Sequence, residues 1–447
     1  MTTLHAKQAL LPSGWADDVR ISIAAGRIAA IETGVPAAPV DERLQAVVPG
    51  MPNLHSHAFQ RAMAGLAERR GAGEDNFWSW RTVMYRFALQ MNPDQLEAVA
   101  AQLYMEMIEA GFCRIGEFHY LHHDRDGRPY ADIAEHAARI AAASETAGIS
   151  LTLLPVFYAH SDFGGKVPID GQRRFINSVA QFETLMAKSR EIVSGLDGGI
   201  LGVAPHSLRA VTPEELAEIV PFAEGGPVHI HAAEQTREVE GALEVLKARP
   251  VEWLIANAGL DQRWCVIHAT HMTERETADL ARSGAVAGLC PITEANLGDG
   301  IFNGPGFLAE GGLFGVGSDS NIAISVSEEL RLFEYSQRLG LRMRNVVSAP
   351  SASTGRHLFD GALAGGGRAM GAASALAAGA SADIVALTSG DADYWRGDDL
   401  LDQWIFAQGV RVDAAWARGR KLVNNGRHVD RDRIAARFTA AMRSMLA

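Results

Sequence analysis

Two histidines separated by a single residue stand at the end of an apolar run. His55 and His57 follow residues 46–51, whose apolar character and flanking Pro49 and Gly50 are typical of a short buried strand. Because residues i and i+2 of a strand point to the same side, both imidazoles aim at one point where the strand ends. A metal ion is the simplest group to hold at that point. An isolated pair of this kind would more often be two surface histidines in a loop, so the rest of the chain has to decide.

Further histidines and acidic residues stand at the ends of later predicted strands. Each of them alone would more often be a packed or surface residue than a ligand. Random placement would scatter such residues over helices and loops as well, so their shared position favours one common site. These residues are Glu117 and His119, His206, His229, His231 and Glu234, His268, and Asp319.

The donor types in this set match a hydrolytic zinc site. Such a site takes three or four nitrogen or oxygen ligands and keeps one position open for water. We expect His55, His57, His231 and Asp319 to be the ligands of one zinc ion, although iron and manganese accept the same donors. Zinc lowers the pKa of its water from about 15.7 toward about 7, which makes hydroxide available at neutral pH.

Two further residues are placed to move protons and to stabilise charge. Glu234, three residues past His231, can carry a proton from the water to a leaving nitrogen. His268, at the end of the next predicted strand, can stabilise the hydroxide or a developing oxyanion. His229 shares the strand face of His231 one step deeper, and we interpret it as a core residue.

Apolar strands alternate with amphipathic helices through the middle of the chain. The alternation predicts an α/β fold in which residues 46–372 form a (β/α)8 TIM-type barrel, with the site at the carboxyl ends of its strands. Helices are predicted from Asp94 to Ala110, from Ile133 to Ala147 and from Thr273 to Arg282. The predicted strands lie near residues 46–54, 113–118, 149–156, 199–204, 227–231, 264–268, 285–289 and 313–318.

Both ends of the chain have a different sequence pattern, which predicts short strands separated by turns. Residues 1–45 are too short to bury a core alone, and residues 373–428 return to the same pattern. We therefore expect these two segments to form a small β-sandwich domain beside the barrel. Residues 429–447 are predicted to form a C-terminal helix, and residues 361–380, rich in Ala and Gly, a short helix and turns.

Composition excludes several classes of partner. The 447 residues include 41 basic and 53 acidic ones, and the net charge of −12 argues against nucleic acid and anionic membranes. An anionic substrate would therefore need a local cluster of arginines. The three cysteines form no CxxC pair, which fits the reducing cytoplasm, and no apolar run approaches the roughly 20 residues of a membrane helix.

The constellation resembles the deaminase branch of the amidohydrolase superfamily. The resemblance spans nearly the whole chain, and it implies that Asp319 also takes a proton from the water. Binuclear members carry a carboxylated lysine at the end of the fourth strand, where this chain has Ala204, Pro205 and His206, so we expect one metal. The matching residues are Pro52-Asn53-Leu54-His55-Ser56-His57, His231-Ala232-Ala233-Glu234, His268 and Ser318-Asp319.

Within this branch the chain is most similar to the formimidoylglutamate deiminase family. The segments that carry this likeness are residues 57–68, 76–81, 116–120 and 205–209. The resemblance implies attack of the zinc-held hydroxide on the amidine carbon of N-formimino-L-glutamate. The products would be N-formyl-L-glutamate and ammonia, a step of histidine degradation. It also implies a homodimer.

Such a substrate is a small dianionic amidine and needs cationic partners. Arg81 and Arg209 could each bind one carboxylate in fork geometry, and Gln60, Tyr120 and His206 could add hydrogen bonds. Arg81 alone could equally be a surface residue beside two tryptophans. Arg61 is expected to point away from the site.

Three alternatives share parts of this pattern. Deaminases of guanine, cytosine or adenosine-type nucleosides use the same zinc residues, and so do triazine hydrolases. Two arginines would match a neutral base poorly, which favours the dianion. A metal-free binding subunit, the alternative from another class, would be expected to lack ligands, and none is missing here.

Overall fold

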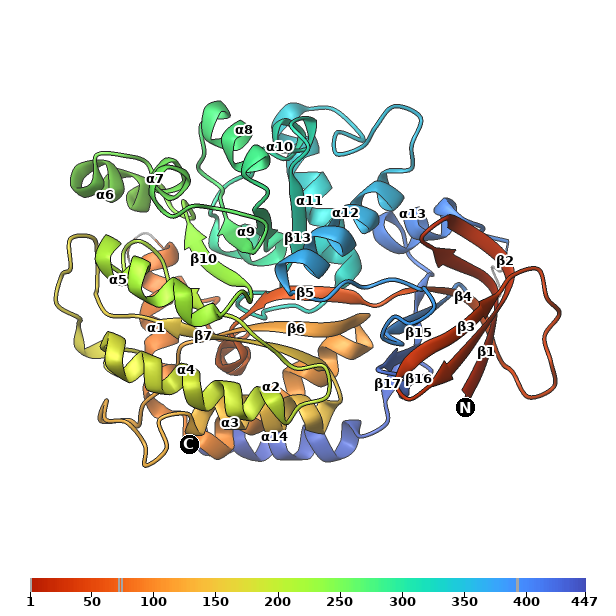
Figure 1. Ribbon diagram of the computed structural model, residues 1–447, viewed down its shortest axis with the longest axis horizontal. Coiled ribbons are helices and arrows are strands. Elements are labelled where there is room, and N and C mark those ends of the chain that lie inside the picture. Colours follow the sequence, from red (N-terminus) through yellow and green to blue (C-terminus); the bar gives the residue numbers. More distant parts are fainter. Residues whose placement is uncertain (1, 71–72, 74, 391–393) are drawn as a thin grey trace.

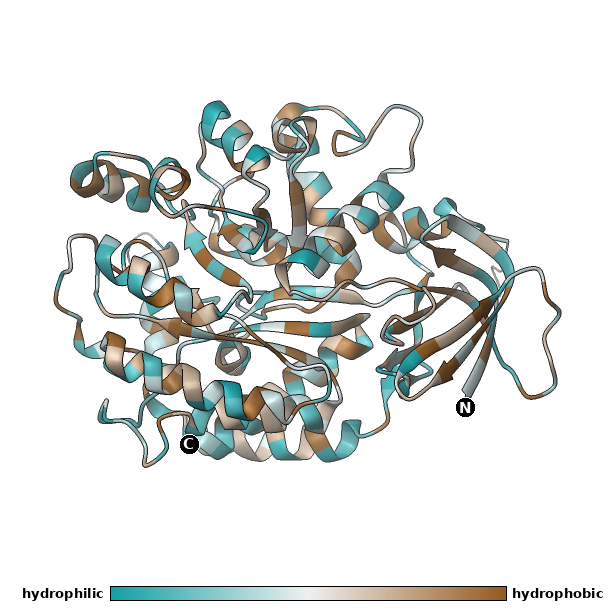
Figure 2. Ribbon diagram, viewed as in Figure 1, coloured by the Kyte–Doolittle hydropathy of each residue, from teal (hydrophilic) through white to brown (hydrophobic). Residues whose placement is uncertain are grey.

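The computed structural model describes residues 2–70, 73, 75–390 and 394–447. Two regions are distinguishable in Figure 1: a large α/β part, and a β-sheet at one end of the molecule to which both ends of the chain contribute. Figure 2 shows brown, apolar segments along the inner strands and helices that carry both hydrophilic and apolar colours. Strands β6 (Phe112–His119) and β7 (Ser150–Phe157) are buried along their whole length. The core of the large part therefore lies on its strands.

The large part contains parallel strands in two sheets. Every pairing inside them is parallel, so the α/β fold with parallel sheets is confirmed. One sheet holds β5 (Met51–Ser56), β6, β7 and β8 (Ile200–Leu201), with β9 (Ala204–Pro205) also paired to β7. The other holds β10 (Val228–Ala232), β11 (Trp264–His268), β12 (Val286–Leu289) and β13 (Leu313–Val316).

The two parallel sheets meet at both of their edges. Ser56 forms a parallel bridge with Asp319 at one seam, and Val203 with Val228 and Ser207 with His231 at the other. The ends of β5, β10 and β13 are thereby brought to the same face of the molecule.

Strands from both ends of the chain pair in one eight-stranded sheet. The chain order in this sheet changes where β4 pairs antiparallel with β14. In sheet order the strands are β17 (Arg427–His428), β16 (Arg420–Asn424), β15 (Arg411–Ala417), β14 (Ile384–Thr388), β4 (Glu42–Pro49), β1 (Thr2–Leu11), β2 (Gly14–Ala24) and β3 (Arg27–Glu32). All eight belong to a single sheet, so the packing of two sheets into a sandwich stays a prediction, as do the domain boundaries.

The strand predicted over residues 46–54 is wrong in one respect, because it is two strands. Residues 46–49 belong to β4 in the terminal sheet, and β5 begins at Met51. Gly50 separates them: its N–H donates to Asp383 O, whereas the N–H of Met51 donates to Gly111 O beside β6. A Cβ at Gly50 would lie 2.2 Å from Cys113 Sγ, so only glycine fits where the chain changes sheets.

Helices surround the parallel strands (Figure 1). They are α1 (Phe77–Gln90), α2 (Pro93–Glu109), α3 (Glu135–Ala147), α4 (Val179–Ser194), α5 (Pro213–Ile219), α6 (Thr236–Leu246), α7 (Pro250–Asn257), α8 (Glu274–Ser283), α9 (Pro291–Leu297), α10 (Gly304–Ala309), α11 (Val326–Leu341), α12 (Thr354–Ala369), α13 (Asp398–Phe406) and α14 (Arg431–Leu446). Short 3-10 helices are η1 (Ala58–Met63), η2 (Asp170–Gln172) and η3 (Val220–Ala223). None of the described helices is long and apolar enough to cross a membrane.

The predicted helix starts agree with the structure to within two residues. Thr273 caps α8 as predicted, accepting from the Glu276 N–H at 3.2 Å. For α2 the cap is Asn92, not Asp94.

The Ala- and Gly-rich segment 361–380 is helical up to Ala369 and forms turns after it, as predicted, but its helix, α12, begins earlier, at Thr354. A Cβ at Gly365 would lie 1.9 Å from Phe314 O, so its glycines allow close packing on β13.

Candidate active site

The two histidines at the end of β5 lie beside the chain that follows β13. Asp319 donates its backbone N–H to His55 O at 3.0 Å, and His57 donates its own to Asp319 O at 3.0 Å. A Cβ at Gly317 would lie 2.8 Å from the backbone nitrogen and oxygen of His55, so glycine permits this approach. Backbone bonds therefore set the position of Asp319 relative to both histidines.

A buried network of amide and hydroxyl groups holds the same two segments together. Asn53 Nδ2 donates to Ser318 Oγ at 2.7 Å, and Asn321 Nδ2 donates to His57 O at 3.0 Å. Asp319 and Asn321 adopt positive φ values of 45° and 59°, which are uncommon for non-glycine residues. The network stabilises a backbone conformation that the local sequence would not favour alone.

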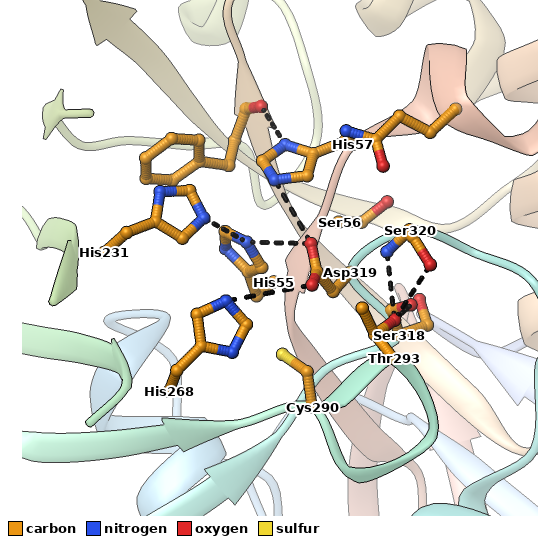
Figure 3. A network of polar contacts seen from close by, with 12 residues as sticks. His55, Ser56, His57, His231, His268, Cys290, Thr293, Ser318, Asp319 and Ser320 are labelled. Carbon is orange, nitrogen blue, oxygen red and sulfur yellow. Dashed lines mark hydrogen bonds and ion pairs between the residues drawn. The ribbon is translucent and has the colours of Figure 1, made fainter. Parts of the chain in front are cut away.

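Four side chains converge at this point (Figure 3). Their donor atoms lie within 4.8 Å of one another, and the four residues are His55, His57, His231 and Asp319. His55 Nε2 lies 3.1 Å from His231 Nε2 and 3.4 Å from Asp319 Oδ1, and His57 Nε2 lies 3.2 Å from the same oxygen. Two ligands of a tetrahedral centre with bonds of about 2.0–2.1 Å are about 3.3 Å apart, so these donors fit one metal ion.

Backbone carbonyls orient two of the imidazoles. His57 Nδ1 lies 3.0 Å from Phe118 O, and His231 Nδ1 lies 2.9 Å from His206 O. A carbonyl oxygen can only accept a hydrogen bond, so Nδ1 carries the proton in both rings. The unprotonated Nε2 then faces the point where the four donors converge. The four residues predicted as ligands are thus brought together, with Nε2 of His57 and His231 directed toward the shared centre.

The pKa shifts of these residues favour the protonation states that bind a metal ion. Burial lowers the pKa of His55 to about 3 and holds that of His231 well below its usual value. Burial alone would raise the pKa of Asp319, but the neighbouring His55 and His57 outweigh it and keep the pKa well below the ordinary value. Neutral imidazoles and an ionised carboxylate are the forms that bind metals.

Glu234 and His268 lie on the open side of the four donors. His268 Nε2 is 3.8 Å from Glu234 Oε1 and 3.8 Å from Asp319 Oδ2. Burial raises the pKa of Glu234 to about 7. Burial would lower the pKa of His268, but the carboxylates of Glu234, Glu294 and Asp319 raise it to about 10.

A cavity opens next to these groups. Its lining includes His57, His231, Glu234, His268 and Asp319, and with them Gln60, Arg81, Tyr120, His206 and Arg209, the residues proposed from sequence for substrate. The remaining lining residues are Phe77, Trp80, Met84, Tyr85, Tyr158, Phe175 and Leu297. Elements far apart in sequence, from η1 and α1 to the segment after β13, therefore line one space.

Three buried polar atoms on this lining have no hydrogen-bond partner among the described residues. They are Gln60 Oε1, Tyr85 OH and Arg209 Nε. Gln60 donates its amide to Tyr120 OH at 2.8 Å, which leaves its oxygen free. Buried polar groups in native proteins nearly always have partners, so these atoms indicate a polar ligand.

Three arginines, two of which line the cavity, surround one indole. The guanidinium carbons of Arg81, Arg209 and Arg237 lie 4.6, 5.9 and 4.5 Å from the ring centre of Trp78. Arg237 was not predicted from the sequence, because α6 follows β10 and nothing local to it indicates that it stacks on α1.

Several residues around the site have no role assigned from the sequence. Glu117 accepts from the Ala58 N–H at 2.7 Å and from Tyr104 OH at 3.0 Å, and burial raises its pKa to about 7. Asn321 and Glu294 contact site residues from other segments. His229 is a core residue as predicted, since its Nε2–H donates to Ala369 O at 2.7 Å.

Comparison with known proteins agrees with this geometry. Residues 46–421 match the amidohydrolase family, and residues 1–45 match the formimidoylglutamate deiminase HutF N-terminal domain. The chain belongs to the amidohydrolase family. It is therefore a hydrolytic enzyme, which excludes the alternative of a non-enzymatic binding subunit.

Individual relatives span the whole chain. A formimidoylglutamate deiminase of Pseudomonas aeruginosa is 49% identical over 453 aligned residues, covering 100% of both chains. A crystal structure of an amidohydrolase from Brucella melitensis is 57% identical, covers 100% of both chains and superposes with a TM-score of 0.98. A 5-methylthioadenosine/S-adenosylhomocysteine deaminase of Natronomonas pharaonis is 28% identical over 76% of this chain and 72% of its own.

Proposed function

We propose that this enzyme hydrolyses N-formimino-L-glutamate to N-formyl-L-glutamate and ammonia, a step in histidine degradation. The observation that carries the proposal is the presence of two arginines, Arg81 and Arg209, in the same cavity as the convergent histidines and acids. The full-length identity of 49% to a formimidoylglutamate deiminase supports it. The nucleoside-deaminase alternative has a more distant relative, at 28% identity.

The proposed scaffold is a closed barrel of eight parallel strands. The bridges at both seams of the two parallel sheets, Ser56 to Asp319 and Val203 to Val228, support closure. A barrel accounts for the shared location of the site residues, because the carboxyl ends of all strands meet at one face.

The proposed cofactor is a single zinc ion held by His55, His57, His231 and Asp319. The spacing and orientation of the four donors support this choice, and iron or manganese would fit the same set. When bound, zinc supplies a Lewis acid that lowers the pKa of a water to about 7.

Arginines bind the two substrate carboxylates in this proposal. Arg209 is buried with a free Nε, and Arg81 lies over the ring of Trp78, so each can receive one carboxylate. The free oxygen of Gln60, with Tyr120 and His206, hydrogen-bonds the rest of the chain. The amidine is thereby held with its carbon toward the four donors, which is the orientation that catalysis needs.

Acid–base residues then complete the reaction. Asp319 takes a proton from the attacking water, and Glu234 delivers a proton to the nitrogen that leaves as ammonia. His268 stabilises the negative charge that develops on the oxygen bonded to the amidine carbon. Its Nε2 lies 3.8 Å from Glu234 Oε1 and 3.8 Å from Asp319 Oδ2, so it faces the place where the reaction occurs.

Ammonia release by the wild-type enzyme tests the proposal. We expect turnover of N-formimino-L-glutamate at a kcat/KM far above that of guanine, cytosine or adenosine, and above that of a chlorotriazine followed by chloride release. A higher kcat/KM on any of these would overturn the assignment. The homodimer is proposed from the family resemblance and the cytoplasmic location from the cysteine usage, and analytical ultracentrifugation tests the homodimer.

A further inference from the structure

Glu294, on the first turn of α9, contacts the ring nitrogen of His268 that faces away from the cavity. His268 Nδ1 lies 3.2 Å from Glu294 Oε1, and the same oxygen accepts the Cys290 N–H at 2.9 Å. All three residues are buried. The opposite nitrogen, Nε2, is the one directed toward Glu234 and Asp319.

We propose that Glu294 is a positioning residue, which acts through His268 by fixing the orientation and the Nδ1 proton of its imidazole. A carboxylate oxygen can only accept here, so Nδ1 must carry hydrogen. The partner of one ring nitrogen decides what the other can do, and a carboxylate commonly plays this part. This inference rests on the proposed function.

Thr293, the residue before Glu294 on the same turn of α9, hydrogen-bonds to the segment that carries Asp319. Thr293 Oγ1 donates to Ser318 O at 3.2 Å and accepts from the Ser320 N–H at 3.2 Å (Figure 3). These two residues flank Asp319. One turn of α9 therefore positions two site residues: His268 through Glu294, and Asp319 through Thr293.

Backbone conformation makes this support necessary. His268 and Ala269 both have positive φ values, 68° and 49°. Such conformations cost about 1–3 kcal/mol each and persist only when the surroundings enforce them. Glu294 bonds at once to the His268 ring and to the backbone at Cys290, which ties the end of β11 to the start of α9.

A second metal ion is a poorer explanation for the same group. The donor atoms of His268, Cys290 and Glu294 lie within 4.8 Å of one another. However, burial raises the pKa of the Cys290 thiol well above its usual value. Glu294 Oε1 also already accepts two hydrogen bonds. Hydrogen bonding alone accounts for the arrangement.

The first test is Glu294→Gln in the zinc-loaded enzyme. We expect kcat to fall by roughly 10- to 100-fold, the usual cost of removing a residue that orients a site histidine, with KM within about twofold and zinc content unchanged. Glu276→Gln is the matched control: Glu276 is also buried and accepts backbone N–H groups, at Thr273 and Glu252, but contacts no site residue described above. It should lower the melting temperature and leave kcat unaltered.

A double-mutant cycle separates positioning from general disruption. If Glu294 acts through His268, adding Glu294→Gln to His268→Ala should change kcat by less than about twofold. The inference is overturned if Glu294→Gln keeps the wild-type kcat, or if it costs the same factor with and without His268. Should Glu294→Gln fail to fold, Glu294→Asp, which keeps the charge but withdraws the oxygen, enters the same cycle with the same expectations. Wild-type enzyme that does not release ammonia from N-formimino-L-glutamate would instead refute the proposed function.

Discussion

Individual side chains at this site are held mainly by partners outside the four-donor cluster. His57 and His231 bond to backbone carbonyls, His268 bonds to Glu294, and Asn321 donates to the carbonyls of His57 and Asp319. The rings of His57, His231 and His268 are thus oriented before a metal or substrate arrives, which is the condition for efficient catalysis.

The role of Glu234 can be tested by replacing one oxygen of its carboxylate with an amide nitrogen. Glu234→Gln keeps the volume but removes the ability to carry a proton, so kcat should fall by roughly 10²- to 10⁴-fold while zinc content stays stoichiometric. Steady-state ammonia release and metal analysis provide the two readings. Glu274→Gln, an exposed change on α8, is the control. An unchanged kcat in Glu234→Gln would remove this residue from the mechanism.

Arg209 offers a second test on a single residue. Arg209→Ala removes a buried guanidinium from the cavity and should raise the KM for N-formimino-L-glutamate by at least roughly 30-fold, equivalent to ~2 kcal/mol. Zinc content should stay the same, because Arg209 contacts none of the four donors. Arg275→Ala, at a side chain that is 87% exposed, serves as control. A wild-type KM in Arg209→Ala would refute the carboxylate clamp.

Between elements, the decisive contact is the one between β5 and the segment after β13. Two backbone hydrogen bonds and the Asn53–Ser318–Asn321 network join them, and Gly317 allows the close approach. The metal-donor geometry therefore depends on strand packing as well as on the donors themselves.

Gly317→Ala tests this dependence. Its Cβ would meet backbone atoms of His55, which cannot rotate away as a side chain could. We expect a destabilisation of about 1–3 kcal/mol, seen as a lower melting temperature, together with reduced zinc occupancy. Gly340→Ala, in the exposed last turn of α11, should be neutral or slightly stabilising. Full zinc occupancy and an unchanged melting temperature in Gly317→Ala would show that the approach is not tight.

For the whole molecule, a bound metal would link the two parallel sheets. His55 and His57 come from one sheet, whereas His231 and the segment carrying Asp319 come from the other. A ligand that binds only the folded state adds stability in proportion to its affinity, about 4 kcal/mol at a thousand times its Kd.

Removing the metal should therefore affect stability as well as activity. We expect a chelator to lower the melting temperature and abolish ammonia release, and added zinc to restore both. Calorimetry and the ammonia assay before and after zinc addition provide the measurement. Metal-free protein that melts at the same temperature and keeps its activity would contradict the zinc assignment.

Much of this protein was predictable because local patterns carry it. The period-two spacing of His55 and His57, and the strand-helix alternation, identify the positions of the parallel strands and hence which residues stand at their ends. The cavity lining contains every residue proposed for substrate, since these residues also follow strands or lie on the next segment.

Tertiary structure alone decided the contacts between distant segments. Asn53 and Ser318 are 265 residues apart, and Glu294 on α9 reaches His268 at the end of strand β11. No local period or spacing indicates such pairs, because side-chain contacts between elements depend on how those elements pack. The division of residues 46–54 between two sheets has the same origin: Gly50 lies against Cys113, and only the folded molecule brings them together.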